Sequence, residues 1–202
     1  TRMTPDHLTI AGMVIAIGAA VAIGAGYLAL GLLLVILAAL PDLLDGALAK
    51  ASNTSSQRGA FFDSVVDRVT DALLFGGVAW YFTSEHSARI ALLPVAVSAV
   101  SQVISYERAK AEALGLSAKG GLMERAERII LLCLGLLFPT LLLPIMWLML
   151  VLTSITAIQR FVKVWRQAAV APVTAAKIEL RRSRRQSRRS ARLDRRTRTT
   201  RR

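Results

Sequence analysis

The longest stretch of this sequence without a charged side chain, residues 8–41, limits what the chain can fold into. A second stretch, residues 69–84, carries only one charged residue, Asp71. A helix that spans a membrane needs about 20 mostly apolar residues, so the first stretch is long enough for two spans. Because the chain of 202 residues is also 54% hydrophobic, we expect a polytopic membrane protein rather than a soluble domain.

Turn and helix-breaking residues divide the chain into six predicted transmembrane helices. Gly24-Ala25-Gly26 offers a turn inside the first uncharged stretch. Pro41 is expected to kink the second helix, and Pro139 and Pro144 to separate the fifth helix from the sixth. The predicted fold is therefore all-α, one bundle over residues 1–166, with helices at residues 8–23, 28–50, 59–82, 89–114, 123–138 and 145–165.

Basic residues decide the predicted orientation and the reading of the C-terminal end. Residues 177–202 hold thirteen Lys and Arg against Glu179 and Asp194. We predict that residues 167–202 form a disordered tail near anionic lipid headgroups, because they are too charged to fold alone. Binding of nucleic acid is the alternative, but it is not expected without zinc-ligand spacing or stacking aromatic residues. Since most loop Lys and Arg lie on the same side as this tail, both chain ends are predicted to be cytoplasmic.

Four aspartates flank the loop between the predicted second and third helices. Asp42 and Asp45 are three residues apart and Asp63 and Asp67 four apart, so each pair projects from one helix face. Any one of them alone would more often be a helix cap or a salt-bridge partner. Four together, with small residues between them, predict an oxygen-only site for Mg²⁺ or Mn²⁺, ions that commonly bridge phosphate oxygens.

The pattern D-x2-D-G-x2-A-K-x8-G-x3-D-x3-D over residues 42–67 resembles the signature of the CDP-alcohol phosphotransferase family, which usually has Arg at the position of Lys50. The resemblance implies that an alcohol hydroxyl attacks CDP-diacylglycerol and releases CMP. It also implies two metal ions held by Asp42, Asp45, Asp63 and Asp67, with Asp67 as the general base. A homodimer in the cell membrane, with its active site facing the cytoplasm, is the expected form.

The same resemblance assigns a set of small and polar residues to the CDP-lipid. These are Thr4, Pro5, Asp6, Gly46, Ala49, Lys50, Ser56 and Gly59. Asp71 lies one turn beyond Asp67 and outside the signature, and we interpret it as structural.

Residues 101–112 and 120–128 resemble, more loosely, the actinobacterial phosphatidylinositol phosphate synthases, which use inositol phosphate as acceptor. Independently, Arg125 and Arg128 lie three apart at a predicted helix start, where the helix dipole and two guanidinium groups suit a phosphate. Their alternative role is to anchor the cytoplasmic side of the helix. The predicted acceptor site consists of Ser105, Arg108, Lys110, Arg125, Arg128 and Arg160.

Two other functions stay open from the sequence. A phosphatidylglycerophosphate synthase would keep the four aspartates and would also use a phosphorylated acceptor, glycerol 3-phosphate. A non-enzymatic membrane anchor for the basic tail belongs to a different class, and the intact aspartate pattern argues against it.

Overall fold

The computed structural model describes the backbone of residues 5–48, 57–118 and 120–199, and the side chains of residues 9–39, 57–118 and 120–169. These residues form six α-helices and no strand, which confirms the all-α prediction for the described part of the chain. The helices are α1 (Pro5–Gly24), α2 (Leu28–Leu48), α3 (Gln57–Glu85), α4 (Leu92–Ala113), α5 (Arg125–Leu137) and α6 (Pro139–Thr199).

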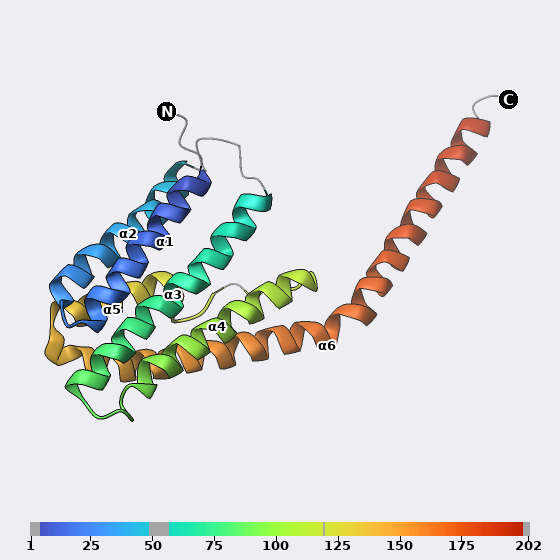
Figure 1. Cartoon of the computed structure of the whole chain (residues 1–202). Coiled ribbons are helices and arrows are strands. Elements are labelled where there is room, and N and C mark those ends of the chain that lie inside the picture. Colours follow the sequence, from blue (N-terminus) through green and yellow to red (C-terminus); the bar gives the residue numbers. More distant parts are fainter. Residues whose placement is uncertain (1–4, 49–56, 119, 200–202) are drawn as a thin grey trace.

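The helices pack in two groups that share one core (Figure 1). α1 packs against α2 and α3, while α4 and α5 pack against α6. α3 also contacts α4, and α5 also contacts α2, so the two groups are joined. The core residues are apolar, as a bundle of this kind requires, and include Ile23, Val35, Phe75, Phe82, Val97, Leu132, Met146 and Met149.

The turn predicted inside the first uncharged stretch is confirmed. α1 ends at Gly24 and α2 begins at Leu28. Between them Gly26 has a φ of 86°, a left-handed conformation that glycine adopts without steric cost. A short glycine turn therefore divides residues 8–41 into two helices.

The last helix differs from the prediction. Pro139 is the first residue of α6, where its missing N–H costs nothing, and Pro144 lies in the second turn instead of ending a helix. α6 then continues without a break through the predicted disordered tail to Thr199, and its last part is turned away from the bundle (Figure 1). Ala, Leu, Lys and Arg are strong helix formers, so an existing helix extends easily through this segment.

One helical segment, Pro139–Ala169, is long and apolar enough to cross a membrane by the criteria of length and composition, within the described residues. Thr9–Gly24 and Leu28–Ala39 are shorter apolar segments. The six-span topology, the kink at Pro41 and the location of the two chain ends stay predictions. Large apolar side chains that face outward suit a lipid environment, and include Val14, Val21, Leu33, Trp147 and Val151.

Two adjacent glycines on α3 give a test of the α1–α3 contact. A Cβ added at Gly77 would lie 2.5 Å from the carbonyl oxygen of Ala20 and 2.9 Å from its Cα, whereas a Cβ at Gly76 would meet nothing within 4 Å. We expect Gly77→Ala to lower the thermal unfolding temperature in detergent, because overpacking costs about 1–3 kcal/mol. Gly76→Ala is the matched control and should be neutral or stabilising. Equal unfolding temperatures for the two variants would contradict this packing.

Candidate functional site

Three carboxylates lie on one face of α3. Asp63, Asp67 and Asp71 follow one another at intervals of four residues, which brings them into line along a helix. Asp63 is exposed, the side chain of Asp67 is 20% exposed, and that of Asp71 is 2% exposed. The row of acids therefore runs from the open end of the helix into the protein interior.

The start of α5 brings two arginines toward this row. Glu124 is the N-cap residue of α5 and forms a capping box with Glu127, whose Oε2 accepts a hydrogen bond of 3.0 Å from the backbone N–H of Glu124. α5 thus begins at Arg125, two residues after the predicted start at Met123, and Arg128 lies about one turn further on. The cap fixes the direction in which both arginines leave the helix.

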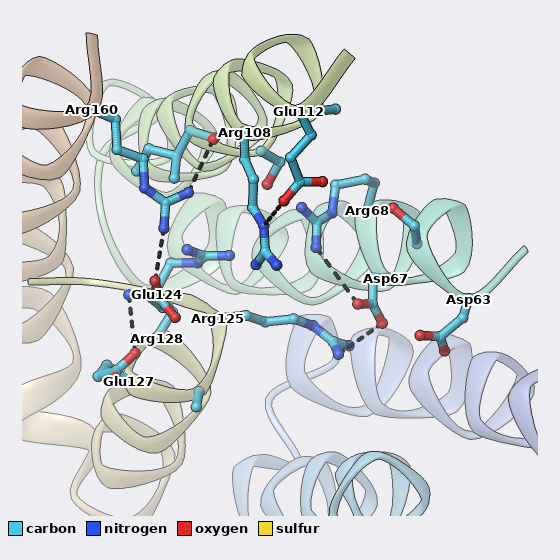
Figure 2. A pocket seen from close by; sticks show the side chains of 15 residues that line it. Asp63, Asp67, Arg68, Arg108, Glu112, Glu124, Arg125, Glu127, Arg128 and Arg160 are labelled. Carbon is cyan, nitrogen blue, oxygen red and sulfur yellow. Dashed lines mark hydrogen bonds and ion pairs between the residues drawn. The ribbon is translucent and has the colours of Figure 1, made fainter. Parts of the chain in front are cut away.

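Both arginines form ion pairs with the acids of α3 (Figure 2 shows the pair with Asp67). Nη1 of Arg125 lies 2.7 Å from Oδ1 of Asp67, and its Nε lies 3.2 Å from Oδ1 of Asp71. Nη2 of Arg128 lies 2.8 Å from Oδ2 of Asp71, and this second pair is almost completely buried. Removing one partner of a buried pair typically costs about 3–5 kcal/mol, because the other charge stays behind unpaired.

Arg160 of α6 joins three segments near the same place. Its Nη1 donates to the carbonyl oxygen of Ile104 on α4 at 3.2 Å, and its Nε to that of Gly120 at 3.0 Å. Its Nη2 donates to Oε1 of Glu124 at 2.9 Å (Figure 2). The side chain is 5% exposed and all three nitrogens have protein partners. Arg160 therefore holds the segment that leads into the cap of α5.

A cavity of about 400 Å³ lies between these groups. Its wall on α3 carries Asp63, Asp67 and Arg68, and the opposite walls come from α4, from the start of α5 and from Arg160 (Figure 2). The polar residues that line it are Asp63, Ser64, Asp67, Arg68, Ser105, Arg108, Glu112, Glu124, Arg125, Glu127, Arg128 and Arg160. Such an arrangement can hold a polyanion against the arginines while a carboxylate faces it from the other side.

The structure brings most of the predicted acceptor residues to this cavity, namely Ser105, Arg108, Arg125, Arg128 and Arg160. Lys110 is exposed and does not line it. Helical periodicity gives the reason: Ser105, Arg108 and Glu112 share one face of α4, and a residue two positions after Arg108 points roughly the opposite way. Nε of Arg108 lies 3.1 Å from Oε1 of Glu112.

Much of the predicted metal and CDP-lipid site lies outside the described residues. Of Thr4, Ala49, Lys50 and Ser56 nothing is described, and of Pro5, Asp6, Asp42, Asp45 and Gly46 only the helical backbone is described. Gly59 lies in the first turn of α3. Among the described residues no group of three or more metal-binding side chains occurs. Asp63 and Asp67 fit half of the predicted set, because both supply carboxylate oxygens to one cavity wall.

Two charged groups at the site were not predicted to be functional. Arg68 lines the cavity, its Nη2 lies 3.6 Å from Oδ2 of Asp67, and its Nε is buried without a hydrogen-bond partner among the described residues. Asp71 binds both arginines of α5 from below the cavity. The continued four-residue spacing after Asp63 and Asp67 is the sequence signal that could have identified Asp71.

Comparison with known proteins gives consistent results. A family model described as CDP-alcohol phosphatidyltransferase matches residues 2–173. A protein of Mycobacterium marinum named phosphatidylinositol phosphate synthase is 37% identical over 173 residues, which cover 81% of this chain and 74% of that protein. A protein of the same name from Mycobacterium tuberculosis is 36% identical over 173 residues, covering 81% and 80%.

Solved structures of the phosphatidylinositol phosphate synthase of Mycobacterium tuberculosis are similar as well. The structure with CDP-DAG bound matches with a TM-score of 0.74 at 35% identity, covering 81% of this chain and 87% of that chain. The structure in complex with manganese and citrate matches with a TM-score of 0.75 at 35% identity, covering 81% and 83%.

Arg160 gives a prediction that follows from its three contacts. Arg160→Lys keeps the charge but loses the guanidinium fork, so it cannot reproduce bonds to Ile104, Gly120 and Glu124 at once. We expect faster amide hydrogen exchange in residues 116–124 and a lower unfolding temperature. Arg166→Lys, at an exposed position of the same helix, is the matched control. Unchanged exchange in the Arg160 variant would show that this side chain does not hold the segment.

Proposed function

The chain belongs to the CDP-alcohol phosphatidyltransferase family, and we propose that it transfers the phosphatidyl group of CDP-diacylglycerol to inositol phosphate, giving phosphatidylinositol phosphate and CMP. Relatives that are 34–40% identical carry the name phosphatidylinositol phosphate synthase, and one related structure has CDP-DAG bound. The observation that carries the proposal is the cavity in which Asp63 and Asp67 face Ser105, Arg108 and Arg125.

The donor side of the proposed site is formed by the aspartates. We propose that Asp42, Asp45, Asp63 and Asp67 hold two Mg²⁺ or Mn²⁺ ions. Two bound divalent ions would neutralise the negative charge of the pyrophosphate and the charge that develops on the leaving phosphate. The manganese in a related structure supports a divalent ion. The CDP-lipid would lie against Gly59 and the residues assigned to it from the sequence: Thr4, Pro5, Asp6, Gly46, Ala49, Lys50 and Ser56.

In the proposed reaction a hydroxyl oxygen of the acceptor attacks the β-phosphorus of the CDP-lipid. A new phosphorus–oxygen bond forms, the bond from the β-phosphorus to the bridging oxygen breaks, and CMP leaves with that electron pair. Asp67 takes the proton of the attacking hydroxyl. Its contact with Nη1 of Arg125 at 2.7 Å limits where this carboxylate can point. Most of the remaining task is to position two anionic substrates against each other.

The acceptor side of the proposed site is formed by arginines that differ in how much binding capacity they retain. All three nitrogens of Arg160 have protein partners, so this residue serves mainly to hold the neighbouring segments in place. The side chain of Arg108 is 50% exposed and that of Arg125 is 25% exposed, and both line the cavity where they can face the phosphate of the acceptor. Arg68 is a further candidate because its side chain is 32% exposed and lines the cavity. Ser105 and Glu112 can bind the hydroxyls of a polyol.

The last part of the proposal concerns the membrane topology and the oligomeric state of the enzyme. We propose a multi-pass protein of the cell membrane with the cavity open to the cytoplasm, as loop charges indicate. The basic C-terminal part of α6 is expected to lie near anionic lipid headgroups. The homodimer remains a proposal that rests on the family resemblance alone.

Glycerol 3-phosphate is the second candidate acceptor, because the arginines of the cavity would also suit its phosphate. The relatives named above favour inositol phosphate. A role as a non-enzymatic anchor is disfavoured by the match of a transferase family to residues 2–173.

The proposed reaction is tested with the full chain in detergent, CDP-diacylglycerol and Mg²⁺. We expect rapid CMP release with inositol phosphate, and slow release with glycerol 3-phosphate or free inositol. Asp67→Asn should reduce turnover at least about 100-fold, since a general base commonly contributes 10²–10⁴-fold. Glu85→Gln makes the same chemical change at the exposed far end of α3 and should leave turnover unchanged. Faster release with glycerol 3-phosphate would favour the second candidate, and no release with any acceptor would contradict both.

A further inference from the structure

Of the three aspartates on this face of α3, Asp71 is the one that the family signature does not include, and it is the most deeply buried. Its side chain is 2% exposed and does not line the cavity. Its two oxygens bind different arginines: Oδ1 lies 3.2 Å from Nε of Arg125, and Oδ2 lies 2.8 Å from Nη2 of Arg128. Both arginines line the cavity. One buried carboxylate therefore fixes two of the cations that face an incoming anion.

The arrangement of the helices explains why such a carboxylate is needed. α3 packs mainly against α1 and α4, while α5 packs mainly against α6 and α2. The side chains of Arg125 and Arg128 extend from α5 to α3 to reach Asp71. Long arginine side chains have many rotamers, and holding each at one nitrogen removes much of that freedom before a ligand binds. Arg128 keeps a buried Nε without a hydrogen-bond partner among the described residues.

Stability alone is a weak explanation for this network. Replacing a buried ion pair by well-packed apolar residues is often neutral or stabilising, since moving charges out of water is expensive. A network that costs desolvation and serves only to join α3 to α5 would gain little. A network that orients donors for a ligand has a different use, because preorganised groups lose less entropy when the ligand binds.

We propose that Asp71 is a positioning residue of the acceptor site: its carboxylate sets the direction in which Arg125 and Arg128 present their guanidinium groups to the phosphate of the acceptor. The inference rests on the proposed function. It assigns no contact between Asp71 and a substrate, and it concerns the phosphate that inositol phosphate and glycerol 3-phosphate share.

The sign of the effect of Asp71→Asn separates positioning from simple electrostatics. Removing a negative charge beneath the cavity makes the cavity more positive, so a purely electrostatic role predicts a lower KM for the phosphorylated acceptor. Loss of positioning predicts the opposite, a KM raised about tenfold or more, with the KM for CDP-diacylglycerol little changed. A purely structural role predicts a lower unfolding temperature with both KM values unchanged.

A double-mutant cycle tests whether Asp71 acts through Arg125. Arg125→Ala leaves Asp71 paired with Arg128, so this single variant should fold. If the proposal holds, each single variant raises the acceptor KM, and the double variant raises it by less than the product of the two single effects, because Asp71 then acts through Arg128 alone. Multiplied effects in the double variant would show that the two residues act independently and would overturn the proposal.

Two further variants keep the test decisive if Asp71→Asn unfolds. Asp71→Glu keeps the charge but moves the carboxylate by one methylene group, and should raise the acceptor KM while the protein stays folded. Thr153→Val removes a buried hydroxyl that donates only within α6, at Met149 and Leu150, and should leave the acceptor KM unchanged. All assays use the full chain with whichever phosphorylated acceptor releases CMP from the unmodified protein, so an error in the proposed acceptor is recognised separately. An acceptor KM that falls or stays unchanged in every Asp71 variant that folds would overturn the proposal.

Discussion

The site depends on the balance of charge between one face of α3 and the start of α5. Asp67 and Asp71 hold Arg125 and Arg128 across the space between the two helices, and the deeper pair is almost completely removed from water. Burying an unpaired charge at this position would cost several kcal/mol per ion. The acids and the arginines can therefore be buried here only as ion pairs. The same pairs leave a cavity in which Asp63 and Asp67 on one wall face the arginines of α4 and α5. A transferase that joins two anionic substrates needs such a cavity.

Local signals predicted the parts of the fold that local chemistry decides. The glycines around residue 25 predicted the turn between α1 and α2, and Glu124 followed by Arg125 marks the observed start of α5. α6 could not be predicted in the same way. Pro144 is a helix breaker by its own chemistry, but near the start of a long helix it removes only one backbone hydrogen bond. Whether a helix continues past such a residue depends on tertiary packing. The helix propensities of single residues do not describe that packing.

The candidate site was predictable as a set of residues but not as a network. The aspartate spacing indicated one helix face, and the arginines were expected nearby. Helical phase alone, applied to residues 92–113, is enough to place Arg108 and Lys110 on different faces of α4. The partners of the arginines could not be obtained from the sequence, because Asp71 and Arg128 are far apart in the chain and meet only through packing. The same holds for Arg160, whose three contacts lie on α4, on the connecting segment and at the cap of α5.

The central claim is that the aspartates of α3 and the arginines of α5 serve one site, in which the metal and the acceptor phosphate meet. Paramagnetic relaxation of the phosphorus nucleus of inositol phosphate by protein-bound Mn²⁺ measures this most directly. The account predicts strong relaxation with the unmodified protein, lost in Arg125→Ala while Mn²⁺ remains bound. Binding of both Mn²⁺ and inositol phosphate to the unmodified protein without relaxation of the phosphorus nucleus would place the two in separate sites and contradict the account.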